Sequence, residues 1–571
     1  MKIDTLRHSL SHILAYAVQE LYPGTKFGIG PAIENGFYYD FEFENPISNE
    51  DLLRIEEKMK ELISRNISFK KRKLPKLSSK RLFKKQPYKL ELINEIEEKK
   101  VIIYESGKFI DVCKGPHIKS TKEINLDAFK LTKIAGAYWR GNEKNPMLQR
   151  IYGVAFKTKR ELRNYLKIQE EVEKRDHRIL GQKLELFSFD EEIGAGLPLW
   201  YPKGAILYKI IEDYLISELL KVNYQLVRSH HIGKEDLFKT SGHLDFYKDY
   251  MYSPIRIENE KYYLKPMNCP FHIKIFKSKI RSYKNLPIRF AELGTVYRYE
   301  RSGVLHGLIR VRGFTQDDAH IWCTPEQLSE ELTSLLKFTF KILKTFGFKN
   351  YEVFLSTRPK KYVGTIKNWK KATDSLKYAL EKVKAPYQID PGEGVFYGPK
   401  IDVKIKDSLG RAWQCTTIQV DFNLPDLFKI FYINKKGKKK RPIMIHRAIL
   451  GSLERFIGLL LEHYAGALPL WLSPEQIWII PIGSRHKKYA TEINKQLTNY
   501  ELRIELKSEN ETVSKKIRDG EIQKIPYLLV VGDKEMKNKS VRVRERGKGD
   551  TGEVKLAQFI KKITRLQNER K

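Results

Sequence analysis

The densest group of residues able to do chemistry lies between residues 289 and 320, in RFAELGTVYRYERSGVLHGLIRVRGFTQDDAH. Its pattern predicts two strands joined by a loop. Arg298 and Glu300 are two residues apart, as are Arg310 and Arg312, so each pair is expected on one strand face. Two guanidinium groups beside a carboxylate suit a phosphate or carboxylate ligand with a divalent cation. A solvated, salt-bridged sheet face would carry the same pattern.

A second group combines histidine and cysteine at a spacing of four residues. His8 and His12 fall within 5–21, whose apolar residues repeat at helical spacing, and they lie on the side away from that apolar stripe. Cys113 and His117 have the same spacing in the turn CKGPH. The two pairs together are typical of a zinc site, whereas the first pair alone could be two histidines on a helix surface.

The elements around these residues divide the chain into blocks. A first domain is expected at 1–157, with a helix over 5–21 capped by Asp4 or Thr5. The other elements expected in this domain are a strand in FYYDFEF, a helix over 49–66, a basic and poorly patterned stretch over 67–86, and a strand in VIIYE. A charged helix over 159–180 then forms a linker at 158–180.

The largest block, 181–471, mixes helices with many β-branched and aromatic runs. The expected helices cover 205–221, 326–346 and 448–465. Strands follow strands over 260–322 without helical crossovers, which favours an antiparallel sheet. Residues 472–571 alternate strand with helix and predict a small α/β domain. The fold class is therefore multidomain α+β.

The composition favours a polyanionic partner. Lysine and arginine number 106 against 70 aspartate and glutamate, a net charge of +36, and the 41% hydrophobic residues exclude a wholly disordered chain. A biased genome composition would give the same lysine excess. Four isolated cysteines exclude a disulfide framework. With no signal peptide and no run of about 18 apolar residues, we expect a cytoplasmic protein with no membrane contact.

Several motifs, taken together, resemble a known family. Arg298-Tyr299-Glu300 followed by Arg310 resembles motif 2 of the class II aminoacyl-tRNA synthetases, and GSLERF at 451–456 resembles motif 3. The resemblance narrows to the bacterial type of threonyl-tRNA synthetase on KPMNCP, LHGLIRVRGFTQDDAHIWC, GEGVFYGPKIDV, QCTTIQVDF and MIHRAILGSLERFIG. HSLSHILAYAVQELYP, DVCKGPH and AGAYWRG resemble that family's N-terminal editing domain.

The resemblance implies three domains and one reaction. It implies an α+β editing domain at 1–157, a class II catalytic domain at 181–471 and an anticodon-binding domain at 472–571. The implied reaction is ATP-dependent ligation of L-threonine to tRNA(Thr) through a threonyl-adenylate, with zinc-dependent selection against valine. Editing of seryl-tRNA(Thr) accompanies it. The implied cofactors are one Zn²⁺ per subunit and Mg²⁺ with ATP, and the implied assembly is a homodimer.

The family's site residues carry over position by position. Those implied for ATP and catalysis are Arg298, Glu300, Arg310, Phe314, Gln414, Thr417 and Arg455. Those implied for threonine are Gln316, Asp318, Tyr397, Lys400 and Gln419. The implied zinc ligands are Cys269, His320 and His446. Those implied for editing are His8, His12, Lys89, Asp111, Cys113 and His117, where the family works without a metal and alanyl-type relatives hold one. The expected anticodon contacts are Asn510, Glu535 and Arg544.

Two departures from the family pattern stand out. The resemblance starts at residue 1, so we expect this chain to lack the ubiquitin-like domain that many bacterial members carry. Motif 1, which builds the dimer interface, has no proline in the matching stretch VRSHHIG. The alternatives are a synthetase for another amino acid, which would lack the Cys269 triad, and an RNA-binding regulator, which could lose the arginines. A free-standing hydrolase of mischarged tRNA would need 1–157 alone.

Overall fold

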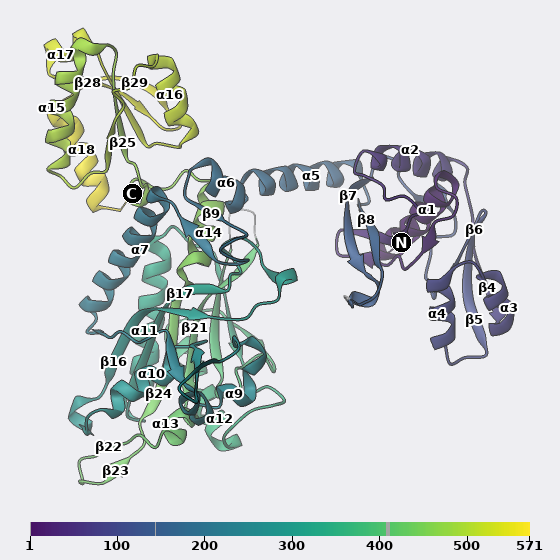
Figure 1. Ribbon diagram of the computed structural model, residues 1–571, viewed down its shortest axis with the longest axis horizontal. Helices are drawn as coiled ribbons and strands as arrows, with labels where there is room; N and C mark the ends of the chain where they lie inside the picture. The colour runs from purple at the N-terminus through teal and green to yellow at the C-terminus, as the bar shows by residue number, and fades with distance from the viewer. Residues whose placement is uncertain (1, 143, 407–410, 571) are drawn as a thin grey trace. The chain divides into compact units, whose positions relative to one another are not determined.

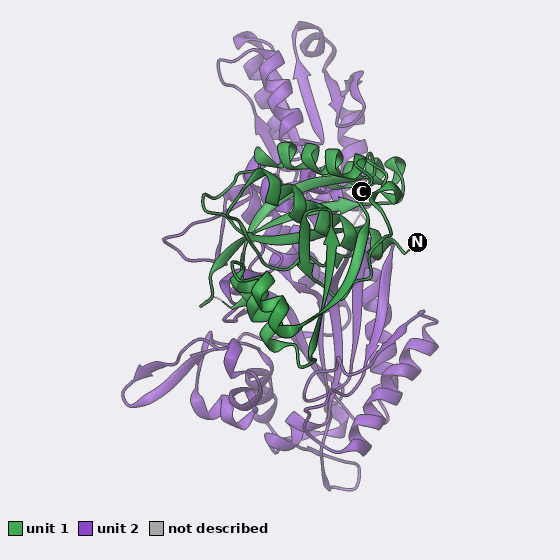
Figure 2. Ribbon diagram, turned by 90° about the vertical axis from the view of Figure 1, so that its right-hand side faces the viewer, with its two compact units in different colours: residues 1–171 green, residues 172–571 purple. Residues whose placement is uncertain are grey.

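The chain forms two compact units in the computed structural model, which describes residues 2–142, 144–406 and 411–570. Unit 1 is residues 1–171 and unit 2 is residues 172–571 (Figure 2). The boundary falls in helix α5 (Lys159–Lys174), and α6 (His177–Lys183) follows it. The prediction of one helix over 159–180 is therefore wrong, because the Asp176 side chain accepts the Arg178 N–H and starts a new helix there.

The main layer of unit 1 is a sheet covered by two helices, α1 (Ile3–Leu21) and α2 (Asp51–Ser64). The strand order is β1 (Lys26–Phe27), β3 (Gly36–Glu42), β8 (Met147–Ala155), β7 (Phe129–Tyr138), with β2 (Ala32–Ile33) beside β3. Leu10 and Ile13 of α1 pack against Phe37 in the core. The expected cap of α1 is wrong: Lys2 precedes the helix and no side chain caps it.

A second, smaller sheet completes unit 1. Its order is β4 (Phe69–Pro75), β5 (Lys100–Ser106), β6 (Phe109–Val112), with α3 (Lys76–Leu82) and α4 (Pro87–Glu95) beside it (Figure 1). The stretch 67–86, expected to be irregular, thus supplies a strand and a helix. Its regularity comes from pairing with β5 and from an apolar cluster that joins Leu74 and Phe83 to Val101.

Unit 2 is built on an eight-stranded sheet that is antiparallel except at its two edges, as predicted. The order is β11 (Gln225–Leu226), β16 (Ile288–Tyr297), β17 (Gly313–Cys323), β24 (Ile443–Ser452), β21 (Ala412–Asp421), β20 (Lys400–Lys406), β18 (Tyr351–Ser356), β19 (Gln388–Asp390). One face packs on α7 (Pro202–Lys221), α11 (Leu328–Thr345), α12 (Ile366–Lys382) and α14 (Leu453–Tyr464). The expected helix over 448–465 is wrong at its start, because β24 continues to Ser452, whose side chain caps α14.

Shorter elements surround this sheet. They are β9 (Phe187–Phe189), β10 (Pro198–Trp200), β12 (Ile232–Lys234), α8 (Glu235–Thr240), α9 (His243–Phe246), β13 (Ile255–Ile257), β14 (Glu260–Leu264), α10 (Cys269–Lys277), β15 (Arg281–Ser282), α13 (Asn423–Leu427), β22 (Tyr432–Ile433) and β23 (Lys439–Lys440). The α10 helix packs with Phe290 and Trp322 on the sheet face away from α11.

The C-terminal part of unit 2 is a five-stranded sheet with helices on both faces (Figure 1). Its order is β26 (Ile504–Leu506), β25 (Ile477–Pro481), β27 (Tyr527–Val531), β28 (Ser540–Glu545), β29 (Gly549–Lys555). The helices are α15 (Lys487–Thr498) and α18 (Leu556–Asn568) on one face, α16 (Val513–Ile522) on the other, and α17 (Asp533–Asn538). Among the described residues, no helix combines the length and apolar character needed to cross a bilayer.

Candidate active site and metal centre

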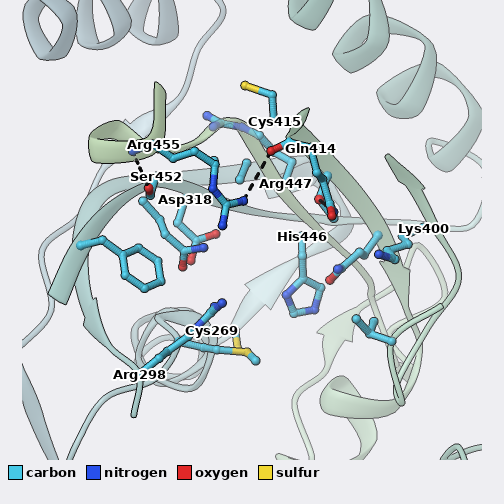
Figure 3. A pocket seen from close by; sticks show the side chains of 18 of the residues that line it. Cys269, Arg298, Asp318, Lys400, Gln414, Cys415, His446, Arg447, Ser452 and Arg455 are labelled. Carbon is cyan, nitrogen blue, oxygen red and sulfur yellow. Dashed lines mark hydrogen bonds between the residues drawn. The ribbon is translucent and has the colours of Figure 1, made fainter. Parts of the chain in front are cut away.

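A cavity of about 400 Å³ lies on the face of the eight-stranded sheet opposite α11 and α14 (Figure 3). All the residues that the sequence pointed to for nucleotide, amino acid and metal line it. They are Cys269, Arg298, Glu300, Arg310, Phe314, Gln316, Asp318, His320, Tyr397, Lys400, Gln414, Thr417, Gln419, His446 and Arg455. Segments up to 186 residues apart along the chain, from Cys269 to Arg455, therefore meet in one site.

Strand register explains why these residues meet. His320 lies opposite His446, His446 opposite Gln419, and Gln419 opposite Lys400, in one row across β17, β24, β21 and β20. Neighbours in the chain point the other way, so that Ile321, Ile445 and Ile418 are buried under the helices.

Arg298 and Arg310 reach the cavity from the loop between two strands and not from the strands themselves. Strand β16 ends at Tyr297 and β17 begins at Gly313, so the two-residue alternation does not apply to residues 298–312. Arg310 lines the cavity and forms an ion pair with Glu300 at 2.9 Å. Arg312 instead donates to the Glu300 carbonyl at 2.9 Å and lies over the Tyr299 ring. The expectation that both arginines share one face is wrong.

Arg455 is held by its own helix and by the loop before β17. Its backbone N–H is capped by Ser452, and its Nε donates to the Ile309 carbonyl at 2.9 Å. Burial lowers the pKa of Arg455, and the nearby Arg298 and Arg310 lower it further. Three guanidinium groups thus face one cavity, and a polyanion such as a triphosphate would relieve their mutual repulsion.

Asp402 organises the opposite wall of the cavity. Its buried carboxylate is 2.7 Å from Lys400 Nζ and accepts from Gln414 Nε2 at 2.7 Å and from Thr417 Oγ1 at 2.9 Å. Three residues expected to contact substrates are therefore held by one carboxylate. Sequence reasoning missed Asp402, which in the sequence is one acidic residue among many.

Cys269, His320 and His446 form a buried cluster whose ligand atoms all lie within 4.8 Å of one another. His320 Nε2 and His446 Nδ1 are 3.1 Å apart. Two nitrogen ligands of a tetrahedral zinc ion would be about 3.3 Å apart, given a zinc–nitrogen bond of about 2.0–2.1 Å. One cysteine and two histidines also match the ligand types that zinc prefers.

Carboxylates behind the two histidines fix which ring nitrogen faces the cluster. His446 Nε2 lies 2.9 Å from Asp421, so its proton sits there and Nδ1 keeps a free lone pair. His272 Nε2 lies 2.9 Å from Glu292, and His272 Nδ1 lies 2.8 Å from His320 Nδ1. Glu292 therefore fixes the tautomers of both rings. His272 carries its proton on Nε2 and accepts from His320 Nδ1–H, which leaves a lone pair on His320 Nε2.

This arrangement fits a metal cation. Two lone pairs, on His320 Nε2 and His446 Nδ1, face each other at 3.1 Å, which is repulsive unless a positive charge lies between them. Burial lowers the pKa of His320 and favours the neutral ring that binds metal. Burial raises the pKa of the Cys269 thiol, and a bound cation would stabilise its thiolate. Sequence reasoning missed His272, Glu292 and Asp421, although carboxylates behind metal-binding histidines are expected.

Asp318 and Tyr397 border the same cluster. Asn268 Nδ2 donates to Asp318 at 3.0 Å, and Tyr397 donates to Gln419 at 2.6 Å. Burial raises the pKa of Asp318. Asn268 is the one hydrogen-bond donor to this half-buried carboxylate among the described residues, so Asp318 can accept a further hydrogen bond from a ligand hydroxyl.

Unit 1 brings its expected editing residues together in a second cluster. Ligand atoms of His8, His12, Cys113 and His117 lie within 4.8 Å of one another, and Cys113 Sγ is 3.2 Å from His8 Nε2 and 3.3 Å from His117 Nε2. Ser9 Oγ lies 3.1 Å from His117 Nδ1. The histidines therefore face a shared site and not solvent, which excludes the helix-surface interpretation.

Lys89 and Asp111 support this cluster from behind. They form a buried ion pair, and Tyr39 donates to Asp111 at 2.6 Å. Asp111 also lies 3.7 Å from His12 Nε2. Within the described residues, the buried His12 Nδ1 has no hydrogen-bond partner, so it can bind a ligand.

Burial sets the protonation of the cluster. It raises the pKa of Cys113 to about 12 and lowers the pKa of His8, His12 and His117. A protonated thiol is a weak nucleophile, whereas neutral rings can accept a proton from water.

The expected anticodon contacts come from three different elements of the C-terminal part of unit 2. Glu535 is buried and accepts the Gly532 N–H at the start of α17, whereas Arg544 pairs with Glu521 at 3.3 Å. Asn510 is exposed in the loop before α16. No hydrogen bond or ion pair joins these three across the part of the chain that the structure describes.

The chain resembles known proteins along its length. A model of the class II tRNA synthetase core domain (G, H, P, S and T) matches 250–464, an anticodon-binding domain model matches 476–566, and the second additional domain of threonyl and alanyl tRNA synthetases matches 101–152. A threonine–tRNA ligase of Sulfurihydrogenibium sp. is 54% identical over 99% of this chain and 88% of its own. One from Aquifex aeolicus is 53% identical over 98% and 88%. In a crystal structure of the RNA binding domain of threonyl-tRNA synthetase from Cryptosporidium parvum, identity is 42% and the TM-score 0.66, covering 68% of this chain and 98% of that one.

Proposed function

Because this chain belongs to the threonyl-tRNA synthetase family and is an aminoacyl-tRNA ligase, we propose that it joins L-threonine to tRNA(Thr) through a threonyl-adenylate. In this proposal the chain also selects threonine with zinc and hydrolyses seryl-tRNA(Thr) in unit 1. The observation that carries the proposal is the shared cavity, where three arginines face a Cys-His-His cluster. The corresponding domains are 1–157, 158–180, 181–471 and 472–571.

Arg298, Arg310 and Arg455 hold the phosphates of ATP while the threonine carboxylate attacks the α-phosphate, the bond to the β-phosphate breaks and pyrophosphate leaves. Negative charge accumulates on phosphorus in that step, and fixed guanidinium groups stabilise it without reorganising. Phe314, beneath the Arg298 guanidinium at 5.1 Å from the ring centre, stacks on adenine. Glu300, Gln414 and Thr417 bind the rest of the nucleotide. Mg²⁺ bound with ATP would neutralise further phosphate charge.

Asp318 accepts the hydroxyl of threonine, and Gln316, Tyr397, Lys400 and Gln419 surround the amino acid. Zinc held by Cys269, His320 and His446 would act as a Lewis acid and bind the amine and hydroxyl at positions that the three protein ligands leave open. Valine has no hydroxyl group to donate to Asp318. A site built to bind that hydroxyl can therefore discriminate against valine by about 10⁴-fold.

Serine keeps the hydroxyl and lacks one methyl group. Loss of one methyl group lets a pocket discriminate against a substrate by only about 10–200-fold. A second, hydrolytic site is therefore needed. We place it at His8, His12, Cys113 and His117, where neutral imidazoles position a water molecule without a metal and Lys89 and Asp111 assist.

The assembly is a homodimer in the cytoplasm, with the tRNA anticodon on the C-terminal sheet. Support for a dimer comes from edge strand β11, whose Leu226 is 48% exposed, and from the exposed Leu220 (51%) and Val222 (38%) just before it in the chain. Asn510, Glu535 and Arg544 stay the predicted anticodon contacts. Sedimentation of the purified chain at micromolar concentration tests the dimer, and a sedimentation coefficient of a monomer would contradict it.

Exchange of pyrophosphate into ATP tests the proposed activity. We expect exchange that depends on threonine, is weaker with serine and is absent with valine. Equal exchange with valine would contradict selection through the hydroxyl. Strong exchange with another amino acid and none with threonine would contradict the proposed substrate.

A further inference from the structure

A buried histidine outside the active-site cavity links two of its walls. His177 belongs to α6, is fully buried, and forms a cluster with Asp176 and Glu462. Its Nδ1 lies 2.8 Å from Glu462 Oε1, and its Nε2 accepts the Leu308 N–H at 3.0 Å. Both ring nitrogens are engaged, so this cluster is not a metal site, and the ring is a neutral tautomer protonated on Nδ1.

The ring is enclosed by two glycines. A Cβ atom on Gly307, which has φ of +46°, would lie 2.2 Å from His177 Nε2, and one on Gly458 of α14 would lie 3.4 Å from His177 Cδ2. Leu308 is itself fully buried. The loop before β17 can therefore approach α14 this closely because glycine stands at both positions.

The hydrogen bond that His177 accepts lies one residue before the carbonyl that holds Arg455. Leu308 donates its N–H to His177, and the next residue, Ile309, accepts Arg455 Nε at 2.9 Å. Arg310 follows directly and pairs with Glu300 in the cavity. One imidazole thus anchors the loop at the point from which two of the three cavity guanidinium groups are oriented.

We propose that His177 is a positioning residue for ATP: it touches no substrate, and it acts through Leu308 and Ile309 on Arg455 and Arg310. This proposal rests on the proposed function, in which those arginines bind the nucleotide phosphates. Glu462 serves by fixing the His177 tautomer, so that Nε2 always presents a lone pair to the loop. Displacement of a positioned group by about 1 Å can cost about 100-fold in rate.

Three replacements of one residue test this role. His177→Gln can place an amide oxygen near Nε2 and keep the bond to Leu308, whereas His177→Asn reaches only the Nδ1 position and keeps the bond to Glu462. We expect His177→Asn and His177→Ala to lower kcat/KM for ATP about 10–100-fold, through a higher KM and a lower kcat, and His177→Gln to restore it to within about 3-fold. KM for threonine and zinc content stay unchanged.

A neighbouring control separates positioning from stability. Asp176→Ala removes the cap of α6 and leaves the Leu308 bond intact, so it should lower the melting temperature without changing KM for ATP. Direct titration with a non-hydrolysable ATP analogue gives the same comparison without turnover, so it holds even if threonine is not the substrate. If His177→Asn and His177→Gln bind the analogue as tightly as the native chain, the proposal is wrong. If all three His177 variants and Asp176→Ala weaken binding of the analogue equally, His177 has only a structural role and the proposal is also wrong.

Discussion

Glu292 should control zinc affinity although it lies two rings away from the metal position. In the native chain its carboxylate accepts from His272 Nε2 at 2.9 Å and from the Ser229 N–H and hydroxyl at 2.8 and 2.7 Å. In Glu292→Gln, one oxygen becomes an amide donor. If that donor faces His272, both rings reverse their tautomers and the proton moves to His320 Nε2, which then cannot bind metal. If it takes the place of Oε1 instead, it opposes the Ser229 N–H and lies beside the Lys265 ammonium group, which is 3.8 Å from Oε1 in the native chain.

The expected loss of zinc affinity is 10–100-fold, the usual effect of removing a partner behind a metal-binding histidine, or about 1.4–2.7 kcal/mol. Zinc affinity is measured by competition with a chromophoric chelator at constant pH. Glu331→Gln is the matched control, because Glu331 is equally buried and pairs with Arg289 at 2.6 Å without reaching the cluster. Unchanged zinc affinity in a folded Glu292→Gln protein would refute the tautomer argument.

Four further outcomes are expected. Cys269→Ala should lower zinc from one ion per chain to none and abolish threonine-dependent pyrophosphate exchange; a metal-free variant with full activity would contradict the zinc role. His8→Ala with His12→Ala should let seryl-tRNA accumulate while threonyl-tRNA forms normally, and native clearance of serine would show that editing lies elsewhere. Asp402→Asn, which weakens its hold on Lys400, Gln414 and Thr417, should raise KM for ATP and threonine about 10-fold, against an unchanged melting temperature. Burial raises the pKa of Glu454 from its ordinary 4.5 to about 7, so the folded chain binds more protons than the unfolded chain between these pH values. The free energy of unfolding should therefore fall by about 3 kcal/mol as the pH rises from 4.5 to 7. Denaturant unfolding of Glu454→Gln should lack this pH dependence, and an unaltered pH dependence would contradict the argument.

The layout of unit 2 could be predicted because its signals are local. Alternating runs predicted strands, and the absence of crossovers predicted the antiparallel sheet. The cavity residues came from the family resemblance, since nothing local connects Cys269 with His446. Their meeting depends on strand register, which is set by pairing over the whole sheet and leaves no mark at any one residue.

The predictions that were wrong fail for related reasons. Residues 310 and 312 follow strand alternation only if they are in a strand, and β17 starts one residue later. The helix expected to run through Arg175 and Asp176 is interrupted by a capping side chain that propensity alone does not weigh. His272 and Glu292 could not be found, because their role exists only in contact with His320.

Strand register also limits which insertions and deletions the gene can tolerate. It aligns the row formed by His320, His446, Gln419 and Lys400. Successive residues of a strand point to opposite faces of the sheet. Deleting one codon within β17, β24 or β21 would therefore exchange the two faces beyond the deletion, so that polar residues would point into the helix-packed core and isoleucines into the cavity. A codon deleted from the Asn434–Lys438 turn leaves the register of the eight-stranded sheet intact, because this turn joins two strands of a separate small sheet. Lineages of this enzyme are therefore free to vary in length at their turns, whereas single-codon gaps inside these three strands should be lethal, a pattern that a deletion library would display directly.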